Sequence, residues 1–164
     1  MSSKIKISLS EKSVGEAIKE LRQYKKSLDM KMQELCRKLA EMGAVKVSLG
    51  YARAPYTGTK DISVSVEPID KGYAIKASGE SLLFVEFGAG VTHGYGHPQA
   101  AEFGYGPGTY PPINPNNPKW DNPKGWYIPG GEHTYGNAPS ATMYQTAKEL
   151  EEEVLRTARE VFNS

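Results

Sequence analysis

The residues of this chain best suited to chemistry are three histidines in its second half, with glutamates nearby in sequence. The histidines are His93, His97 and His133, and the glutamates are Glu86, Glu102 and Glu132. Imidazole nitrogens and carboxylate oxygens are common ligands of catalytic zinc. The set would therefore suit a small zinc-dependent hydrolase that acts on cell wall or nucleic acid.

The spacing of the histidines argues against a preformed metal site. His93 and His97 stand four residues apart, but Gly-Tyr-Gly lies between them and Pro98 follows, which excludes a helix that would align the two rings. Only a loop would gather the three histidines. We therefore expect ordinary hydrogen-bonding histidines, no metal and no cofactor, with the hydrolase as the alternative.

Other signatures of catalysis are missing from the sequence. There is no Walker phosphate loop and no Gly-x-Ser-x-Gly nucleophile elbow. The lone cysteine, Cys36, excludes an internal disulfide framework, fits a reducing cytoplasm and suits a small apolar position on a helix. No stretch approaches the ~20 apolar residues of a membrane span, and no apolar core of signal-peptide length occurs at the N-terminus. We expect a protein that is made in the cytoplasm, is not an enzyme and has no membrane partner.

The region from residue 88 to residue 139, called the arm below, has the most unusual composition. It holds 11 Gly and 9 Pro but only five charged side chains, so the sequence predicts no helix or long strand there. Both tryptophans and several other aromatic residues lie in it, which is unlike a disordered linker. Its only cations are Lys119 and Lys124, too few for a nucleic-acid groove. Aromatic residues with few charges favour protein–protein contact.

Two amphipathic helices are predicted on either side of the sheet-forming region. The first runs from about Ser13 to Met42, with a capping box at Ser13 and a C-terminal cap at Gly43. Its apolar residues recur at heptad spacing and form what we call the seam: Val14, Ile18, Leu21, Leu28, Met32, Leu35, Leu39 and Met42. The second helix covers about residues 140–162. A first helix of this length either lies across a sheet or also serves a neighbouring subunit.

Several runs have the pattern of β-strands. Apolar and polar residues alternate over residues 4–9, 62–67 and 73–77, and the last two are separated by a turn at residues 70–72. Ala44–Leu49 is also strand-like, and the nearly all-apolar run Leu82–Phe87 is typical of a strand buried on both faces. The fold class predicted is α+β, with an antiparallel sheet of about four strands packed by the two helices. Residues 1–164 would form one domain with the arm as an insertion.

Charge is unevenly distributed, although the formal net charge is only +1. Residues 1–50 hold 11 Lys/Arg against 6 Asp/Glu, and residues 79–164 hold 5 against 10. Such asymmetry suits a subunit whose one side meets the opposite side of a neighbour, but solvated surfaces also produce it.

Three stretches resemble the phage tail-completion family, the head–tail joining proteins that include minor tail protein Z. Residues 77–90, ASGESLLFVEFGAG, are similar to the family's A-S-G-E…F-x-E-F-G-T-G signature, with Ala89 where threonine is common. GWYIP at 125–129 and HTYGNAP at 133–139 resemble its later G-W-x-Y…T-x-G-x-x-A element. ATMY at 141–144 then opens the final helix, and PYTGT at 55–59 also lies where the family places it.

The resemblance implies a structural virion protein at the tail top or neck of a phage or phage-like particle. It implies a homohexameric ring on the tail's sixfold axis that terminates the tail tube or joins the tail to the head. Partners would be further copies of the chain, the tail tube or sheath protein, and a head-side connector or neck protein, with DNA only as passing cargo. Assembly would take place in the bacterial host cytoplasm. Terminator and adaptor roles, contractile and non-contractile tails, and complete and headless particles all stay open.

The same resemblance directs attention to one set of residues. Glu86 is expected to face a partner or a helix end, and Gly88 and Gly90 to turn the chain out of the sheet. Trp120, Trp126 and Tyr127 are expected to anchor the arm on its own domain or on the next subunit. The interface and arm residues predicted are Glu86, Phe87, Gly88, Gly90, Tyr105, Tyr110, Trp120, Trp126 and Tyr127, and the seam positions are Leu21, Leu28 and Leu35.

Overall fold

The computed structural model describes residues 11–90, 96–104, 122–127 and 131–163. Its elements are α1 (Glu11–Arg53), β1 (Ser63–Ile69), β2 (Gly72–Ser78), α2 (Leu82–Phe87), β3 (Trp126–Tyr127), β4 (His133–Thr134) and α3 (Thr142–Asn163). The predicted α+β class is confirmed, with a long N-terminal helix and a C-terminal helix. The described residues form two antiparallel sheets of two strands each, β1–β2 and β3–β4, and not one sheet of four. The strand predicted at residues 4–9 lies outside the described residues.

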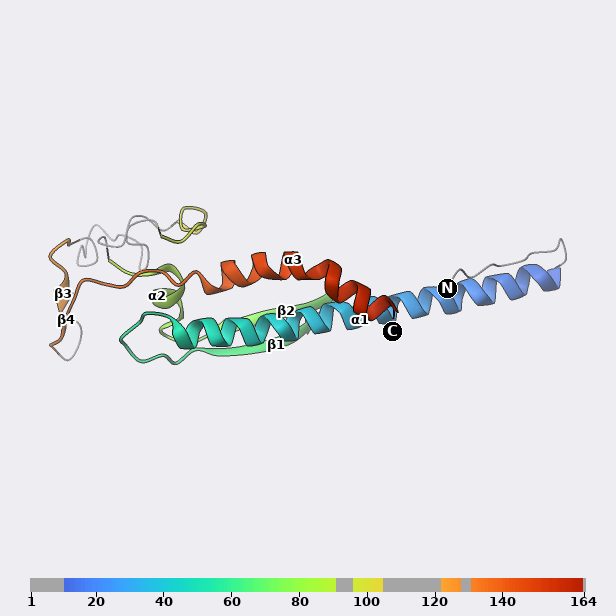
Figure 1. The fold of residues 1–164 in the computed structure, drawn as a ribbon, viewed down its shortest axis with the longest axis horizontal. Coiled ribbons are helices and arrows are strands. Elements are labelled where there is room, and N and C mark those ends of the chain that lie inside the picture. The colour runs from blue at the N-terminus through green and yellow to red at the C-terminus, as the bar shows by residue number, and fades with distance from the viewer. Residues whose placement is uncertain (1–10, 91–95, 105–121, 128–130, 164) are drawn as a thin grey trace.

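Helix α1 is longer than predicted, and the strand predicted at Ala44–Leu49 is wrong. The helix continues through this run to Arg53 (Figure 1). Its buried positions are Ala40, Gly43, Val47 and Tyr51, which follow the three-to-four residue period of a helix. Of the three apolar residues that alternate in this run, only Val47 is buried, whereas Val45 and Leu49 are 60% and 48% exposed, as a helical period requires.

Gly43 lies inside α1 because of close packing and does not end the helix as predicted. A side chain there would collide with the ends of Ile75 from β2 and Leu150 from α3. The glycine therefore lets one turn of α1 approach both neighbours. In an ordinary helix interior, Gly in place of Ala lowers helix stability by about 1 kcal/mol. At position 43 the close packing of α1 on β2 and α3 offsets this cost.

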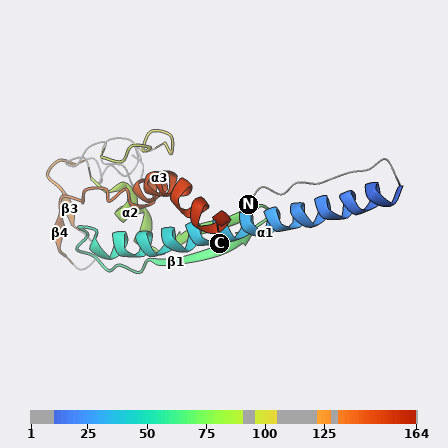
Figure 2. The same ribbon diagram turned by 45° about the vertical axis from the view of Figure 1, so that its right-hand side comes forward.

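The β1–β2 hairpin has the predicted strands and turn. Its register pairs Val64 with Ala77 and Val66 with Ile75 around a loop at residues 70 and 71. The hairpin lies along the C-terminal half of α1 (Figures 1 and 2). Val64, Ile75 and Ala77 pack against the core centred on Val47, while Ser63, Ser65 and Lys76 are exposed. One face of the hairpin is therefore apolar and covered, and the other is polar.

Leu82–Phe87, predicted as a buried strand, is the short helix α2. Asp61 fixes its start, because the carboxylate accepts hydrogen bonds from the amides of Glu80 and Ser81 and from the Ser81 hydroxyl. These bonds lower the pKa of Asp61 to about 2. A six-residue apolar run has too few residues to show whether its period is that of a helix or of a strand.

Helix α3 confirms the predicted C-terminal helix and packs beside α1 (Figure 1). The buried side chains include Thr142, Thr146, Thr157 and Val161. The sequence also predicts an apolar stripe along this helix, formed by Met143, Ala147, Leu150, Val154, Ala158 and Val161. Of these residues Val161 is buried, whereas Ala147 and Val154 are exposed. Threonine serves as a core residue in α3 because its methyl group packs inward; the Thr157 hydroxyl bonds to the Glu153 carbonyl oxygen at 3.0 Å.

The N-terminal part of α1 projects beyond the rest of the molecule (Figures 1 and 2). Helix α3 ends near Lys31, whose Nζ donates a hydrogen bond to the Phe162 carbonyl at 3.1 Å. Exposure along the seam rises from Leu35, which is 7% exposed beside α3, through Leu28, which is half-buried, to Leu21, which is 52% exposed. The rise is not uniform, because Met32 is 49% exposed and Ala17, on the same face of the helix, is buried. None of the described helices has the length and apolar character to cross a membrane.

Candidate functional site

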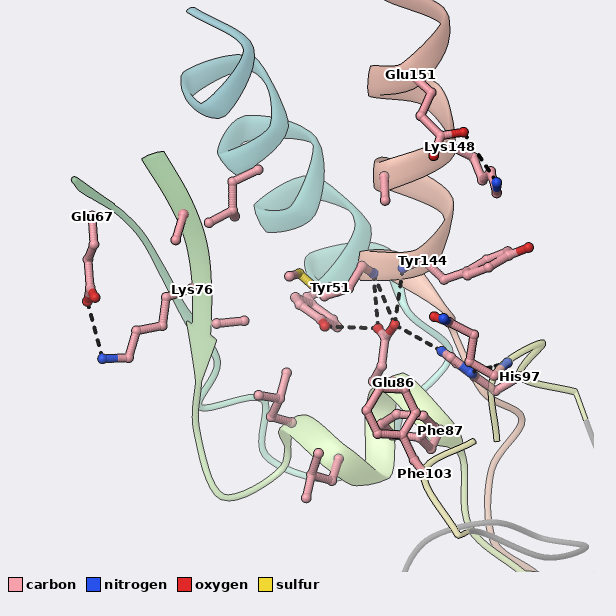
Figure 3. Close-up of a pocket in the computed structure, with 18 residues that line it drawn as sticks. Tyr51, Glu67, Lys76, Glu86, Phe87, His97, Phe103, Tyr144, Lys148 and Glu151 are labelled. Atoms are coloured by element: carbon pink, nitrogen blue, oxygen red, sulfur yellow. Dashed lines mark hydrogen bonds and ion pairs between the residues drawn. The ribbon is translucent and has the colours of Figure 1, made fainter. Parts of the chain in front are cut away.

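A buried carboxylate, Glu86, joins four parts of the chain. Its oxygens accept hydrogen bonds from the Tyr51 hydroxyl of α1 at 2.9 Å and from His97 Nε2 at 3.2 Å. They also accept from the Met143 amide at 3.1 and 3.2 Å and from the Tyr144 amide at 3.4 Å, both in the first turn of α3. Figure 3 shows these donors converging on one side chain, which we call the Glu86 network. Only 5% of Glu86 is exposed.

The network explains how α2 holds the start of α3. The first amides of a helix have no partner within the helix, and they carry a partial positive charge that favours an anion. Glu86 supplies that anion from another element. The sequence predicted that Glu86 would face either a partner or a helix end, and in the structure it faces the start of α3. Two main-chain bonds reinforce the junction: the Ser140 and Ala141 amides donate to the Val85 and Glu86 carbonyls at 2.9 and 3.1 Å. Ala141 has a φ of 47°, a left-handed conformation that costs an alanine roughly 1–2 kcal/mol.

His97 is held on both ring nitrogens. Nδ1 accepts a hydrogen bond from the Gln99 amide at 3.1 Å, so the ring proton lies on Nε2, which donates to Glu86. The ring is 3% exposed and lies 4.3 Å from the ring of Phe87. In this arrangement neither nitrogen can bind a metal or accept a substrate proton without losing an existing bond.

Tyr51 completes the network as a donor. Burial, and secondarily the negative charge of Glu86, raises the pKa of the Tyr51 hydroxyl far above its ordinary value. The hydroxyl therefore keeps its proton and donates to the carboxylate. The network as a whole is a satisfied buried cluster, which positions elements and leaves no free reactive group.

An apolar cleft of about 730 Å³ opens beside the network, between β2 and α3, with α2 at one end (Figure 3). Its lining includes Ile75, Ala77, Leu83, Phe87 and Met143, and Glu86 and His97 lie at its inner end. Ion pairs flank it: Glu67 with Lys76, and Lys148 with Glu151, each at 3.2 Å. The cleft therefore presents an apolar surface to a ligand, and the charges at its rim are paired with one another.

The arm is anchored on its own chain in the described parts. Gly88 and Gly90 have φ values of 78° and 83°, as expected of a chain that turns sharply out of the preceding element. Ala89 and Asn137 exchange two main-chain hydrogen bonds of 3.0 Å, and Asn137 Nδ2 donates to the Phe84 carbonyl at 2.8 Å. Trp126 is buried against Gly90, where an added Cβ would meet its ring at 3.0 Å.

The other predicted residues fall into different environments. Phe87 is buried between His97 and Phe103, whereas Tyr127 is 71% exposed and stacks edge to face on His133 at 4.9 Å. His97 and His133 thus lie among different neighbours. The described residues contain no group of three or more His, Cys, Asp or Glu placed to hold a metal. His93, Tyr105, Tyr110 and Trp120 lie outside the described residues.

Three residues of the site were not predicted from the sequence as functional or structural positions. Tyr51 could have been noticed because it continues the buried helical spacing from Val47, had the strand at Ala44–Leu49 not been preferred. Asp61 and Asn137 stand in turn-rich segments where such residues are common, so nothing in the local pattern separates a long-range cap from an ordinary turn.

Two of the stretches that carry the resemblance, residues 77–90 and 133–139, meet in space. The Ala89–Asn137 bridge and the Asn137–Phe84 bond join them, and α3 begins three residues after the second stretch. Motifs far apart in the sequence therefore build one junction. No family model, no curated protein and no solved structure matches this chain.

Proposed function

We propose that this chain is a structural virion protein at the tail top or neck of a phage or phage-like particle. Copies of it form a ring, with six subunits as the resemblance implies, that ends the tail tube or joins the tail to the head. The observation that carries the proposal is the seam of α1, which is buried at Leu35 and exposed at Leu21.

An exposed seam of this kind supports self-association. Strict heptad spacing is the pattern by which a helix packs against another helix. Val14, Ile18 and Leu21 hold that spacing on the projecting part of α1, yet no other described element covers them. Full burial of an exposed side chain of this kind contributes about 1.5–3 kcal/mol. Because these three residues are 44%, 45% and 52% exposed, a neighbouring subunit that covers the seam gains about half of that for each.

The Glu86 network supports a structural role in a different way. Its carboxylate and both histidine nitrogens are occupied, and it ties α1, α2, α3 and residue 97 into one unit. Such fixed relations between elements suit a subunit that keeps its shape within an assembly. The tail tube or sheath protein and a head-side connector are the further partners, and DNA passes through without specific binding.

The test compares two full-length variants that each add one positive charge to α1. Leu21→Lys alters the seam, and Gln23→Lys alters the opposite side of the helix, two residues further along. We expect closed rings of about six subunits for the wild type and for Gln23→Lys, by light scattering and negative-stain imaging. Leu21→Lys should be monomeric with unchanged helix content. Rings that persist in Leu21→Lys, or a wild type that is monomeric at every concentration, would overturn the proposal.

Metal content provides a separate check on the hydrolase alternative. The wild-type protein is purified without chelator, and its zinc content per chain is measured. The same measurement is made on a variant in which His93, His97 and His133 are replaced by alanine. One zinc per chain, lost in the triple variant, would support the hydrolase against the structural role.

A further inference from the structure

We propose that the cleft between β2 and α3 receives residues 4–9 of a second copy of this chain as an added β-strand paired with β2. The proposal names the contact by which neighbouring subunits join and rests on the self-association proposed above. Three observations support the proposal: the edge of β2 is unpaired, the hairpin has one apolar and one polar face, and α1 is too long for residues 4–9 to reach the cleft of their own chain.

The edge of β2 is open toward the cleft. Among the described residues β2 pairs with β1 alone. Four consecutive residues of β2, Ala74–Ala77, line the cleft. Because successive side chains of a strand point to opposite faces, a cavity lined by four in a row reaches both faces of β2, as is expected beside its unpaired edge. Such an edge presents backbone N–H and C=O groups that another strand can pair with.

The hairpin also determines what kind of strand would fit. Its inner face carries Val66, Ile75 and Ala77, and its outer face carries Ser65 and Lys76. A third strand beside β2 must continue both faces, with apolar residues directed to α1 and the cleft floor and polar residues directed to solvent. Two-stranded sheets are marginal by themselves, so a third strand would also stabilise the hairpin.

Residues 4–9 have this pattern. Ile5, Ile7 and Leu9 alternate with Lys4, Lys6 and Ser8, without Gly or Pro. Six extended residues span about 20 Å, close to the length of the seven-residue strand β2. The charged lysines would lie on the outer face, where Glu67 and Lys76 already form an exposed ion pair.

The strand must come from another copy because its own cleft is out of reach. Residues 11 and 43 of α1 stand about 48 Å apart along the helix, and Gly43 is the turn that packs on Ile75 of β2. Lys4 stands seven residues before Glu11, and each extended residue adds at most about 3.6 Å, so residues 4–9 reach back roughly 25 Å at most and cannot return to β2. The N-terminal part of α1 projects beyond the other described elements (Figure 1), so Glu11, from which this segment continues, lies far from the cleft of its own chain. A contact of this kind is head-to-tail, the type that generates rings when its rotation closes.

Peptide binding tests the proposal without depending on rings. The acceptor is full-length protein with Ile5→Asp and Ile7→Asp, so that its own segment does not compete. The probe is a fluorescent peptide of residues 2–10, followed by anisotropy, beside an otherwise identical peptide with aspartate at positions 5 and 7. We expect the aspartate peptide to bind at least about tenfold more weakly, because two buried isoleucines are lost.

Two further peptides distinguish strand addition from apolar docking. One is N-methylated at residues 5 and 7, and the other at residues 4 and 6. Only alternate amides of a strand face its partner, so one of these peptides should lose binding and the other should keep it. Equal binding by both, or no binding by the unmodified peptide, would overturn the proposal.

Assembly of the full-length variants separates this inference from the ring itself. I5D/I7D should fail to form rings, and the control K4Q/K6Q, altered on the polar face, should form them. Rings formed by I5D/I7D would overturn strand addition and leave the ring intact. Specific peptide binding together with a wild type that forms no rings would uphold strand addition and overturn the ring.

Discussion

The Tyr51 hydroxyl, near the end of α1, lies 2.9 Å from a Glu86 carboxylate oxygen in α2, and both groups are buried. This bond links two residues that are 35 positions apart in sequence. The same carboxylate holds the first amides of α3, so one side chain sets the relative positions of three helices. Glu86 is therefore the first residue to test.

Glu86→Gln should reduce the free energy of unfolding by about 2–4 kcal/mol. The amide lacks the negative charge that the α3 amides and Tyr51 bond to, and its NH₂ group would face other donors. Urea unfolding followed by circular dichroism measures the change. The control is Glu152→Gln on the exposed side of α3, expected to change stability by less than about 0.5 kcal/mol. Equal stability of the two variants would show that the network is not structural.

Gly43→Ala should destabilise the protein by about 1–3 kcal/mol, against the usual effect of this substitution in a helix. The added Cβ would collide with Ile75 and Leu150. Gly15 lies in the same helix with open space around it, so Gly15→Ala should stabilise by about 0.5–1 kcal/mol. Thermal unfolding of both variants checks the signs. A stabilising Gly43→Ala would mean that α1, β2 and α3 are less closely packed than described here.

Gly43 also illustrates where sequence reasoning succeeds and where it fails in this fold. The helices and the hairpin were predictable because their heptad and alternating patterns extend over many residues. The end of α1 and the nature of α2 were not, since both depend on contacts with distant elements: Gly43 with Ile75 and Leu150, and Asp61 with the start of α2. The predicted importance of Glu86 rested on the family resemblance. Its donors Tyr51 and Met143 come from segments far away in the sequence, and only the fold reveals that they bind Glu86.

Stability should decrease between about pH 4 and pH 2 in a manner that depends on Asp61. Its pKa is about 2 when folded, below the ordinary 3.8, so the unfolded chain binds a proton more readily. The contribution of Asp61 is therefore fully present above about pH 4 and is lost as the pH falls through the folded-state pKa. Unfolding titrations of the wild type and Asp61→Asn at pH 2–7 measure this, and the difference between them should shrink toward pH 2. A difference that is constant over this range would exclude the proposed cap of α2.

Trp126→Ala should unfold the arm from the body or abolish ring assembly. The side chain is buried, its ring packs on Gly90, and large-to-small changes of this type cost about 3–5 kcal/mol. Tyr127, the next residue, is 71% exposed, so Tyr127→Ala is a matched control that should cost less than about 1 kcal/mol. Urea unfolding gives the stability of each variant, and light scattering gives its assembly state. Retained stability and retained assembly in Trp126→Ala would contradict the view that this tryptophan anchors the arm. Loss of assembly in Tyr127→Ala with unchanged stability would instead identify the exposed ring as the contact with a neighbour.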